Sequence, residues 1–241
     1  MGSAIFDFSR LRPTARKILH QVRRARAYPL LHIGQISSTR PLSNASGFDR
    51  GTPIDRYYVE QFLSEHAHDI RGCVLETGDA SYSLRFGGER VTKQHIIHVD
   101  HSNPAATIVG DLSEPGTLPP KTFDCILLTQ TLQYVFDVPA AVKQIRDALR
   151  PGGVALVTVP GVAPISHDDW EDSFYWRFTA TSLERLFESA FAKSAIVVKP
   201  FGNLYAATTF LHGAAVQEVN KSKLIPVDPA YAIVICARAV A

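Results

Sequence analysis

The sequence predicts an α/β fold with a doubly wound, mainly parallel β-sheet. Short aliphatic and β-branched runs alternate along residues 48–241 with amphipathic stretches of helical spacing. Four of the runs end directly at polar residues, a pattern typical of buried parallel strands with ligand-binding groups at their carboxyl ends. These two observations predict a sheet with a binding site along one edge.

Strands are predicted at residues 73–75, 95–99, 107–109, 125–128, 154–159, 196–199 and 232–237. Helices are predicted at residues 11–26, 139–149, 179–191 and 203–219, and in a further stretch that follows residue 52. In that stretch Thr52 is the expected N-cap, and Pro53 the first helical residue, because proline is tolerated there.

The link between the second and third predicted strands is unusually short. Six residues separate Asp100 from Thr107, whereas a parallel crossover that contains a helix needs about a dozen or more. Either this crossover has no helix or one strand assignment is wrong. Without the helix one flank of the sheet is uncovered, and the N-terminal helix is the candidate to cover it.

Composition favours an ordinary soluble protein. The chain has 241 residues, of which 46% are hydrophobic, enough for one large α/β domain or two small ones. No apolar run approaches the roughly 20 residues of a membrane-spanning helix, and the N-terminus does not resemble a secretion signal. Cys73, Cys125 and Cys236 lie far apart beside apolar runs, as expected of buried reduced thiols. We therefore expect a cytoplasmic protein.

Charge is concentrated near the N-terminus. Residues 10–26 carry seven basic side chains and no acid, so the net charge of +2 leaves −5 on the rest of the chain. An acidic body argues against nucleic-acid binding. We expect residues 1–47 to form a basic helical extension and connector, and residues 48–241 the main domain. The helix at 11–26 either packs on that domain, contacts an anionic membrane or acidic partner, or serves as a linker.

The first strand and the turn after it are the centre of the predicted site. The run Cys73–Leu75 meets Glu76, and Gly78 follows before a helix-compatible stretch that ends at residue 88. Glycine suits a turn near a ligand because it has no Cβ and lets the backbone come close.

The order of motifs resembles that of class I S-adenosylmethionine-dependent methyltransferases. The motifs are Glu76-Thr-Gly78, Asp100, Gly110-Asp111-Leu112, the stretch at 123–135 and Leu149-Arg-Pro-Gly-Gly, which turns a helix into the fifth strand. Of the family pattern acid-x-Gly-x-Gly-x-Gly only Glu76 and Gly78 match, because Ala80 and Tyr82 occupy the other glycine positions. The resemblance implies a Rossmann-like, mainly parallel seven-stranded sheet whose last strand is antiparallel.

A narrower resemblance is to type-11 methyltransferases of bacterial glycan and polysaccharide pathways, in which the glycine loop is similarly depleted. It rests on five segments, at residues 50–58, 74–79, 106–112, 172–179 and 201–204. This resemblance implies O-methylation of a saccharide or glycan precursor.

The family resemblance also implies a site for S-adenosylmethionine, with S-adenosylhomocysteine as the product. Asp100 would accept hydrogen bonds from the ribose hydroxyls. Asp111 would accept one from the adenine amino group, and Leu112 beside it would donate its backbone N–H. Glu76, Thr77, Gly78 and Asp79 would lie along the methionine part, and Gln130 and Thr131 beside the sulphonium. The alternative for each residue is an ordinary strand-terminal turn or helix cap.

Residues 164–178, after the fifth strand, supply a titratable and aromatic cluster where acceptors bind in this fold. His167 has the intrinsic pKa of a general base for a sugar hydroxyl, and Asp168 would orient it. The acceptor-binding candidates are Asp169, Trp170, Tyr175, Trp176 and Arg177. A divalent cation at Asp168 or Asp169 is an alternative that no regular ligand spacing supports. The other alternative for this segment is a solvated acidic loop with aromatic rings packed beneath it.

Two further functions stay open. The substituted glycines are also compatible with a catalytically inactive methyltransferase-like protein that acts as a binding partner. An active enzyme with a small natural product or an amine as its acceptor has the same motifs.

Overall fold

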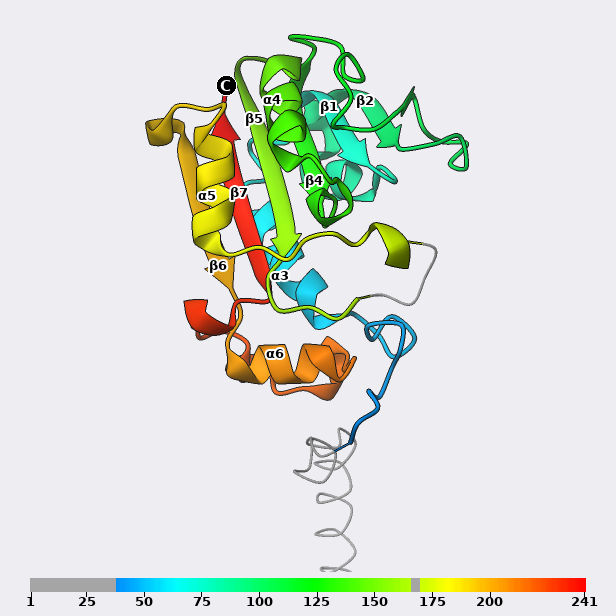
Figure 1. Cartoon of the computed structure of the whole chain (residues 1–241), viewed down its shortest axis with the longest axis vertical. Coiled ribbons are helices and arrows are strands. Elements are labelled where there is room, and N and C mark those ends of the chain that lie inside the picture. The colour runs from blue at the N-terminus through cyan, green and yellow to red at the C-terminus, as the bar shows by residue number, and fades with distance from the viewer. Residues whose placement is uncertain (1–37, 166–169) are drawn as a thin grey trace, which may run out of the picture.

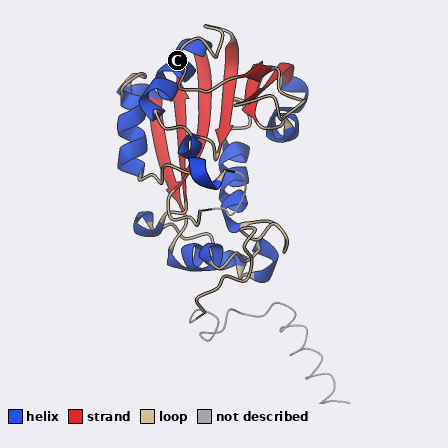
Figure 2. Ribbon diagram, turned by 45° about the vertical axis from the view of Figure 1, so that its right-hand side comes forward, coloured by secondary structure: helices blue, strands red, loops and turns tan. Residues whose placement is uncertain are grey.

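The computed structural model describes residues 38–165 and 170–241, which form a seven-stranded sheet with helices on both faces (Figures 1 and 2). The predicted helix at 11–26 lies outside the described residues. The strands are β1 (Gly72–Thr77), β2 (Val91–His98), β3 (Ile108–Val109), β4 (Phe123–Thr129), β5 (Leu149–Pro160), β6 (Ile196–Phe201) and β7 (Val234–Val240). All seven predicted strands are confirmed.

The sheet order is β3-β2-β1-β4-β5-β7-β6. Strands β1 to β5 are parallel to one another, and β7 is antiparallel to both β5 and β6. This confirms the doubly wound sheet with an antiparallel last strand. Because the chain moves outward from β1 in one direction and from β4 in the other, the β1–β4 boundary is the switch point at which such sheets bind ligands.

The main helices are α3 (Ile54–Glu65), α4 (Val138–Ala148), α5 (Ala180–Glu188) and α6 (Leu204–Leu211). The Asp137 carboxylate caps α4 by accepting from the Ala140 N–H at 3.0 Å, and Thr179 and Ser182 form a capping box at α5. Within residues 38–165 and 170–241, no helix has the length and apolar character needed to cross a membrane.

Two helix predictions need correction. Thr52 is not the N-cap of α3: Pro53 precedes the helix, and the Thr52 hydroxyl accepts from the Gln217 side chain instead. The helix predicted at 203–219 ends at Leu211, because Gly213 takes a φ of 69° and lies so close to Ser43 that a Cβ would clash.

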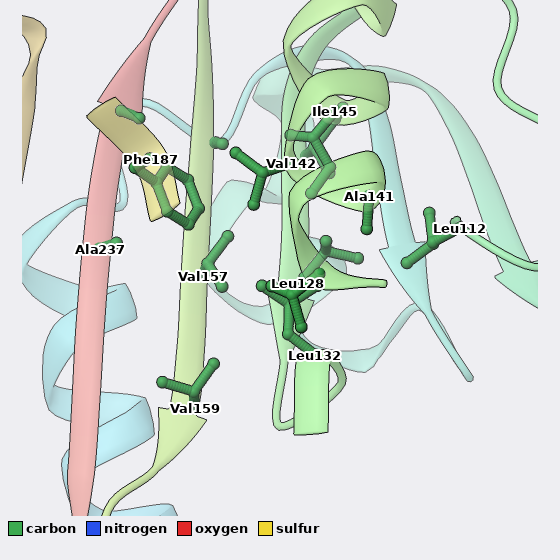
Figure 3. Close-up of a cluster of buried hydrophobic side chains, with 14 of the residues drawn as sticks. Leu112, Leu128, Leu132, Ala141, Val142, Ile145, Val157, Val159, Phe187 and Ala237 are labelled. Carbon is green, nitrogen blue, oxygen red and sulfur yellow. The ribbon is translucent and has the colours of Figure 1, made fainter. Parts of the chain in front are cut away.

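Alternate strand residues feed two cores, as the two-residue period of a strand requires. On one face Leu128 and Val157 pack with Val142 of α4 and Phe187 of α5 (Figure 3). On the other face Val74, Leu127 and Leu156 pack under α3 and α6, whose buried residues include Tyr58, Phe62 and Phe210. All three cysteines are buried and reduced, and burial raises the pKa of each thiol.

The short link between β2 and β3 contains no helix. Residues 99–107 form turns, and the two strands pair in parallel through Ile97 with Ile108 and His98 with Val109. Both strand assignments were therefore right, and the crossover lacks its helix. As expected for such a flank, β2 is largely exposed or half-buried, whereas β1 is buried along its centre.

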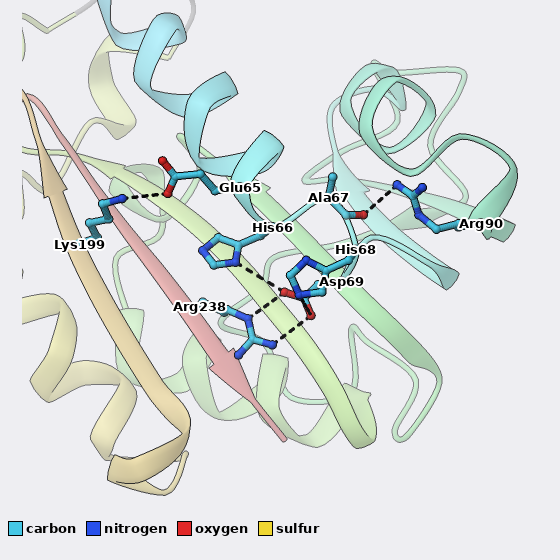
Figure 4. A network of polar contacts seen from close by, with 8 residues as sticks. All are labelled: Glu65, His66, Ala67, His68, Asp69, Arg90, Lys199 and Arg238. Atoms are coloured by element: carbon cyan, nitrogen blue, oxygen red, sulfur yellow. Dashed lines mark hydrogen bonds and ion pairs between the residues drawn. The ribbon is translucent and has the colours of Figure 1, made fainter. Parts of the chain in front are cut away.

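Asp69 organises a polar network at the amino edge of the sheet (Figure 4). Its carboxylate accepts from Nε and Nη2 of Arg238 at 2.8 and 3.0 Å, which joins the α3–β1 connection to β7. Burial of Asp69 opposes ionisation, but the bonds and charge of Arg238 outweigh it and lower the pKa of Asp69 below the ordinary 3.8.

The Asp69→Asn variant should lose about 2 kcal/mol of unfolding free energy at pH 7, because Arg238 loses its charged acceptor. Since the folded pKa of Asp69 is lowered, this stabilisation is present above about pH 3.8 and is lost as the pH falls through the lower folded value. Urea unfolding between pH 7 and pH 3 measures it. Glu65→Gln, which breaks the exposed ion pair with Lys199, is the control and should cost less than about 0.5 kcal/mol. A loss in Asp69→Asn that does not shrink as the pH falls would contradict this account.

Candidate functional site

The carboxyl ends of four parallel strands gather at one edge of the sheet. They bring together Gly78 after β1, Asp100 after β2, Asp111 after β3 and Gln130 after β4. The residues predicted from strand ends thus lie along one edge, with Gly78 and Gln130 on the two sides of the switch point.

The turn after β1 is open toward the outside of the sheet. Gly78 has a φ of 80°, which disfavours any side chain, yet a Cβ there would meet no atom within 4 Å. The buried Oγ1 of Thr77 has no hydrogen-bond partner among the described residues. A buried hydroxyl of this kind usually has a partner, so the turn presents an unused polar group beside open space.

Glu76 supports this turn from inside. It is 1% exposed, and its two carboxylate oxygens accept from the backbone N–H of Tyr82 at 3.0 Å and of Ser83 at 2.8 Å, and from the Ser83 hydroxyl at 2.5 Å. Burial raises the pKa of Glu76 although these bonds oppose the shift. Both oxygens of Glu76 are therefore engaged within the loop.

Asp100 presents an exposed carboxylate at the end of β2. Its Oδ1 accepts from the Ser102 backbone N–H at 2.9 Å and lies 3.2 Å from Nδ1 of His98. Hydrogen bonds from Ser102, and then His98, lower the pKa of Asp100. The group is ionised at neutral pH and accessible to a ligand's hydroxyl groups.

Asp111 and Leu112 form a turn after β3. Asp111 Oδ1 accepts from the N–H and hydroxyl of Ser113 at 2.7 and 2.8 Å. The Leu112 side chain is buried, while its backbone N–H has no hydrogen-bond partner in the part of the chain that the structure describes. A carboxylate beside a free N–H is the pair of groups that the sequence predicts here.

The turn after β4 is strained. Gln130 has a φ of 50°, and its N–H donates to the Thr158 carbonyl of β5 at 2.8 Å. Backbone outliers of this kind cluster at functional sites. The sequence did not point to Gln133, whose buried Oε1 lacks a partner among the described residues while its Nε2 donates to the Gln130 carbonyl at 2.8 Å. The Thr131 hydroxyl donates to the Thr129 carbonyl at 3.1 Å.

An inner group of aromatic rings joins the chain before α5 to this edge. The Trp170 ring lies 5.7 Å from His98 and 5.9 Å from Tyr134, and Tyr134 lies 5.5 Å from Phe174. Trp170, predicted as an acceptor contact, thus lies beside the ends of β2 and β4. His98, Tyr134 and Phe174 were not predicted as site residues.

An outer group of rings, Phe136, Tyr175 and Trp176, is exposed. The Phe136 ring lies 5.3 Å from Tyr175 and 5.9 Å from Trp176, and Phe136 itself is 69% exposed. Trp176 Nε1 donates to the carbonyls of Val135 and Phe136 at 3.1 and 3.2 Å. The rings therefore have defined positions although they face solvent.

The remaining acceptor and base predictions differ in outcome. Arg177 donates from Nε to the Ala163 carbonyl at 2.8 Å and lies over the Phe174 ring, so it helps to hold the segment. His167, Asp168 and Asp169 lie outside the described residues. No group of three or more His, Cys, Asp and Glu residues able to hold a metal ion occurs in residues 38–165 and 170–241.

Two arginines lie at the start of α3, Arg50 before the helix and Arg56 in its first turn. Arg50 is fixed to Glu218, with Nε donating to Oε2 at 2.9 Å. Arg56 has a buried Nη1 without a hydrogen-bond partner among the described residues, 3.8 Å from Asp55 Oδ2. Its charge acts on Tyr82 of the glycine turn, where it opposes the rise in pKa that burial causes. Arg56 Nη1 is therefore a second buried group without a hydrogen bond among the described residues, and its charge acts on the turn.

Comparison with known proteins agrees with this geometry. Residues 40–190 match the model of a family described as a methyltransferase domain. No curated protein matches the chain.

Solved structures share the fold at low identity. An S-adenosylmethionine-dependent methyltransferase from Archaeoglobus fulgidus aligns with a TM-score of 0.52 and 10% identity over 77% of this chain and 94% of its own. One from Mesorhizobium loti gives 0.50 and 17% over 75% and 98%, and the cyclase SpnF gives 0.51 and 14% over 94% of both chains. The family model covers more than half of this chain's residues. The chain therefore belongs to the methyltransferase domain family, with the class I fold of S-adenosylmethionine-dependent methyltransferases.

Proposed function

We propose that this methyltransferase binds S-adenosylmethionine at the carboxyl edge of its sheet and transfers the methyl group to a hydroxyl of a saccharide or glycan precursor. The observation that carries the proposal is the arrangement of the edge. An open glycine turn with unused polar groups lies at the switch point, and exposed aromatic rings lie on the link after β4 and on the chain before α5.

The free polar groups at the edge fit the cofactor. Asp111 and the Leu112 N–H would hold the adenine, and Asp100 would accept from the ribose hydroxyls. The methionine part would lie along Thr77, Gly78 and Asp79, with its carboxylate near Arg56. Gln130 and Thr131 would line the floor of the pocket beside the sulphonium. Glu76 acts through the shape of the turn, because both of its oxygens are occupied.

The cofactor supplies a methyl group that a nucleophile displaces in line, so the protein mainly aligns the two reactants. A sugar hydroxyl must also lose a proton. His167, oriented by Asp168, is the proposed general base. Trp170, two residues after Asp168, contacts His98 at the edge. This contact supports a role in the reaction for the part of the chain that carries His167 and Asp168.

The outer aromatic group is the proposed acceptor platform, together with Asp169 and Arg177. The C–H face of a sugar ring packs on the negative face of an aromatic ring, and Phe136, Tyr175 and Trp176 present such faces to solvent. A contiguous exposed apolar patch on a soluble protein usually marks a binding site. The same rings would also stack on a small phenol, so the acceptor class needs a direct assay.

Incubation of the full chain with methyl-labelled cofactor and free sugars, lipid-linked sugars, small phenols or amines should transfer label to a sugar acceptor. Label found only in phenols or amines would replace the saccharide with a small natural product or amine. Binding of S-adenosylhomocysteine without transfer to any acceptor would favour the inactive, partner-binding alternative.

Replacing Tyr175 with Ala should raise KM for the sugar acceptor about fivefold, because one stacking surface worth about 1 kcal/mol is lost. The affinity for S-adenosylhomocysteine should not change. Tyr231, which is similarly exposed but outside the aromatic groups, provides the control: Tyr231→Ala should leave both constants unchanged. Equal effects of the two variants would remove the platform from acceptor binding.

The His167→Ala variant should lower kcat about a hundredfold or more, as expected for a lost general base, with little change in cofactor affinity. His68→Ala, a change of an exposed histidine at the amino edge, is the matched control. Turnover that survives in His167→Ala would show that another group, or none, takes the proton.

A further inference from the structure

We infer that Gln94 and Asn103 are positioning residues that hold the turn at residues 77–83 in its cofactor-binding shape, in place of the glycines absent at Ala80 and Tyr82. The inference rests on the proposed function, because it concerns how the same turn grips S-adenosylmethionine.

The turn needs such support. Gly78 is the only glycine between residues 77 and 83. The family pattern has two further glycines, which let the backbone adopt its shape without help. In this chain that shape must be fixed by hydrogen bonds to the turn's backbone groups, several of which come from outside it.

Gln94 of β2 supplies the first support. Its Nε2 donates to the Ser83 hydroxyl and to the Ala80 carbonyl, the latter at 3.3 Å. The Ser83 hydroxyl in turn donates to Glu76, and Ser83 is fully buried. The amide of β2 is thereby connected through Ser83 to the acid at the end of β1. Buried polar networks of this kind are rigid when every member has a partner.

Asn103 supplies the second support, from the short link between β2 and β3. Its Nδ2 donates to the Gly78 carbonyl at 2.5 Å, while its Oδ1 accepts from the Ala105 N–H at 3.0 Å. Residues 99–107 contain no helix, so they run as turns that place this amide against the first turn of the site.

Two unusual features of the chain, the depleted glycine turn and the β2–β3 link without a helix, are therefore connected. Without the two glycines the turn depends on support from outside. The link between β2 and β3, which has no helix, provides part of that support. A turn already held in place loses less conformational freedom on binding. Removing either amide should loosen the turn in the free protein and weaken cofactor binding, without unfolding the two cores.

The test uses the full chain with Gln94→Met, which keeps side-chain length but removes the amide, and Asn103→Asp, which keeps the acceptor for Ala105 but removes the donor. Each should raise the Kd for S-adenosylhomocysteine, measured by calorimetry, about five- to tenfold, as expected for one lost hydrogen bond. Amide hydrogen exchange of residues 78–83 in the unliganded protein should become faster. KM for the cofactor should rise while kcat at saturation stays near the wild-type value.

Gln61→Met is the matched control, since among the described residues the Gln61 amide bonds to Glu65 alone, on the same exposed helix face. It should leave Kd, exchange at 78–83 and the thermal unfolding midpoint unchanged. Gln94→Met and Asn103→Asp variants that bind with the wild-type Kd would overturn the inference. So would weaker binding that merely follows a lowered unfolding midpoint. If the wild-type chain binds no S-adenosylhomocysteine, the proposed function fails as well. The variants alone would not show this, so the wild-type titration tells the two failures apart.

Discussion

The buried carboxylate of Glu76 is the constraint on which the candidate site depends. A carboxyl group that is 1% exposed must be fully hydrogen-bonded, and its donors are the backbone of Tyr82 and Ser83 and the Ser83 hydroxyl. To supply those donors the chain must fold back over the end of β1 within seven residues. That reversal places Gly78 at the sheet edge, with its open side outward.

The sheet makes this edge a fixed platform. Central strands such as β4 and β5 are buried on both faces, with alternate side chains in each core. The residues at their ends are therefore placed by rigid elements, and the turns between them need only short-range hydrogen bonds. The less buried flank, at β2 and β3, contributes Asp100, Asp111 and Asn103, which are held by local bonds to serine, to His98 and to the glycine turn.

Much of the fold was predictable because its signals are local. Buried aliphatic runs predicted all seven strands, and Leu149-Arg-Pro-Gly-Gly marked the change from α4 to β5. The errors came from contacts between segments that are distant in the sequence. Thr52 appeared to be a cap, but Gln217, distant in sequence, binds its hydroxyl. The predicted helix at 203–219 was stopped at Leu211 by a glycine turn that packs on Ser43.

The site was predictable only in part. Strand ends in a parallel sheet meet at one edge, so Gly78, Asp100, Asp111 and Gln130 could be assigned to it from the sequence. Gln133, Phe136, Arg56 and Asn103 could not, because their importance comes from burial without a partner, from exposure or from contacts between distant segments. None of these properties has a periodic pattern in the sequence.

The central claim is that the cofactor binds over Gly78 at the switch point. Calorimetric titration of S-adenosylhomocysteine into the wild-type, Gly78→Ala and Gly152→Ala chains tests it most directly. Both glycines have a φ of 80° and open space around a Cβ, so both substitutions cause the same backbone strain, but only Gly78 lies at the site. The account predicts wild-type affinity for Gly152→Ala and clearly weaker binding for Gly78→Ala. Equal affinities of the two variants, or no binding by the wild-type chain, would contradict it.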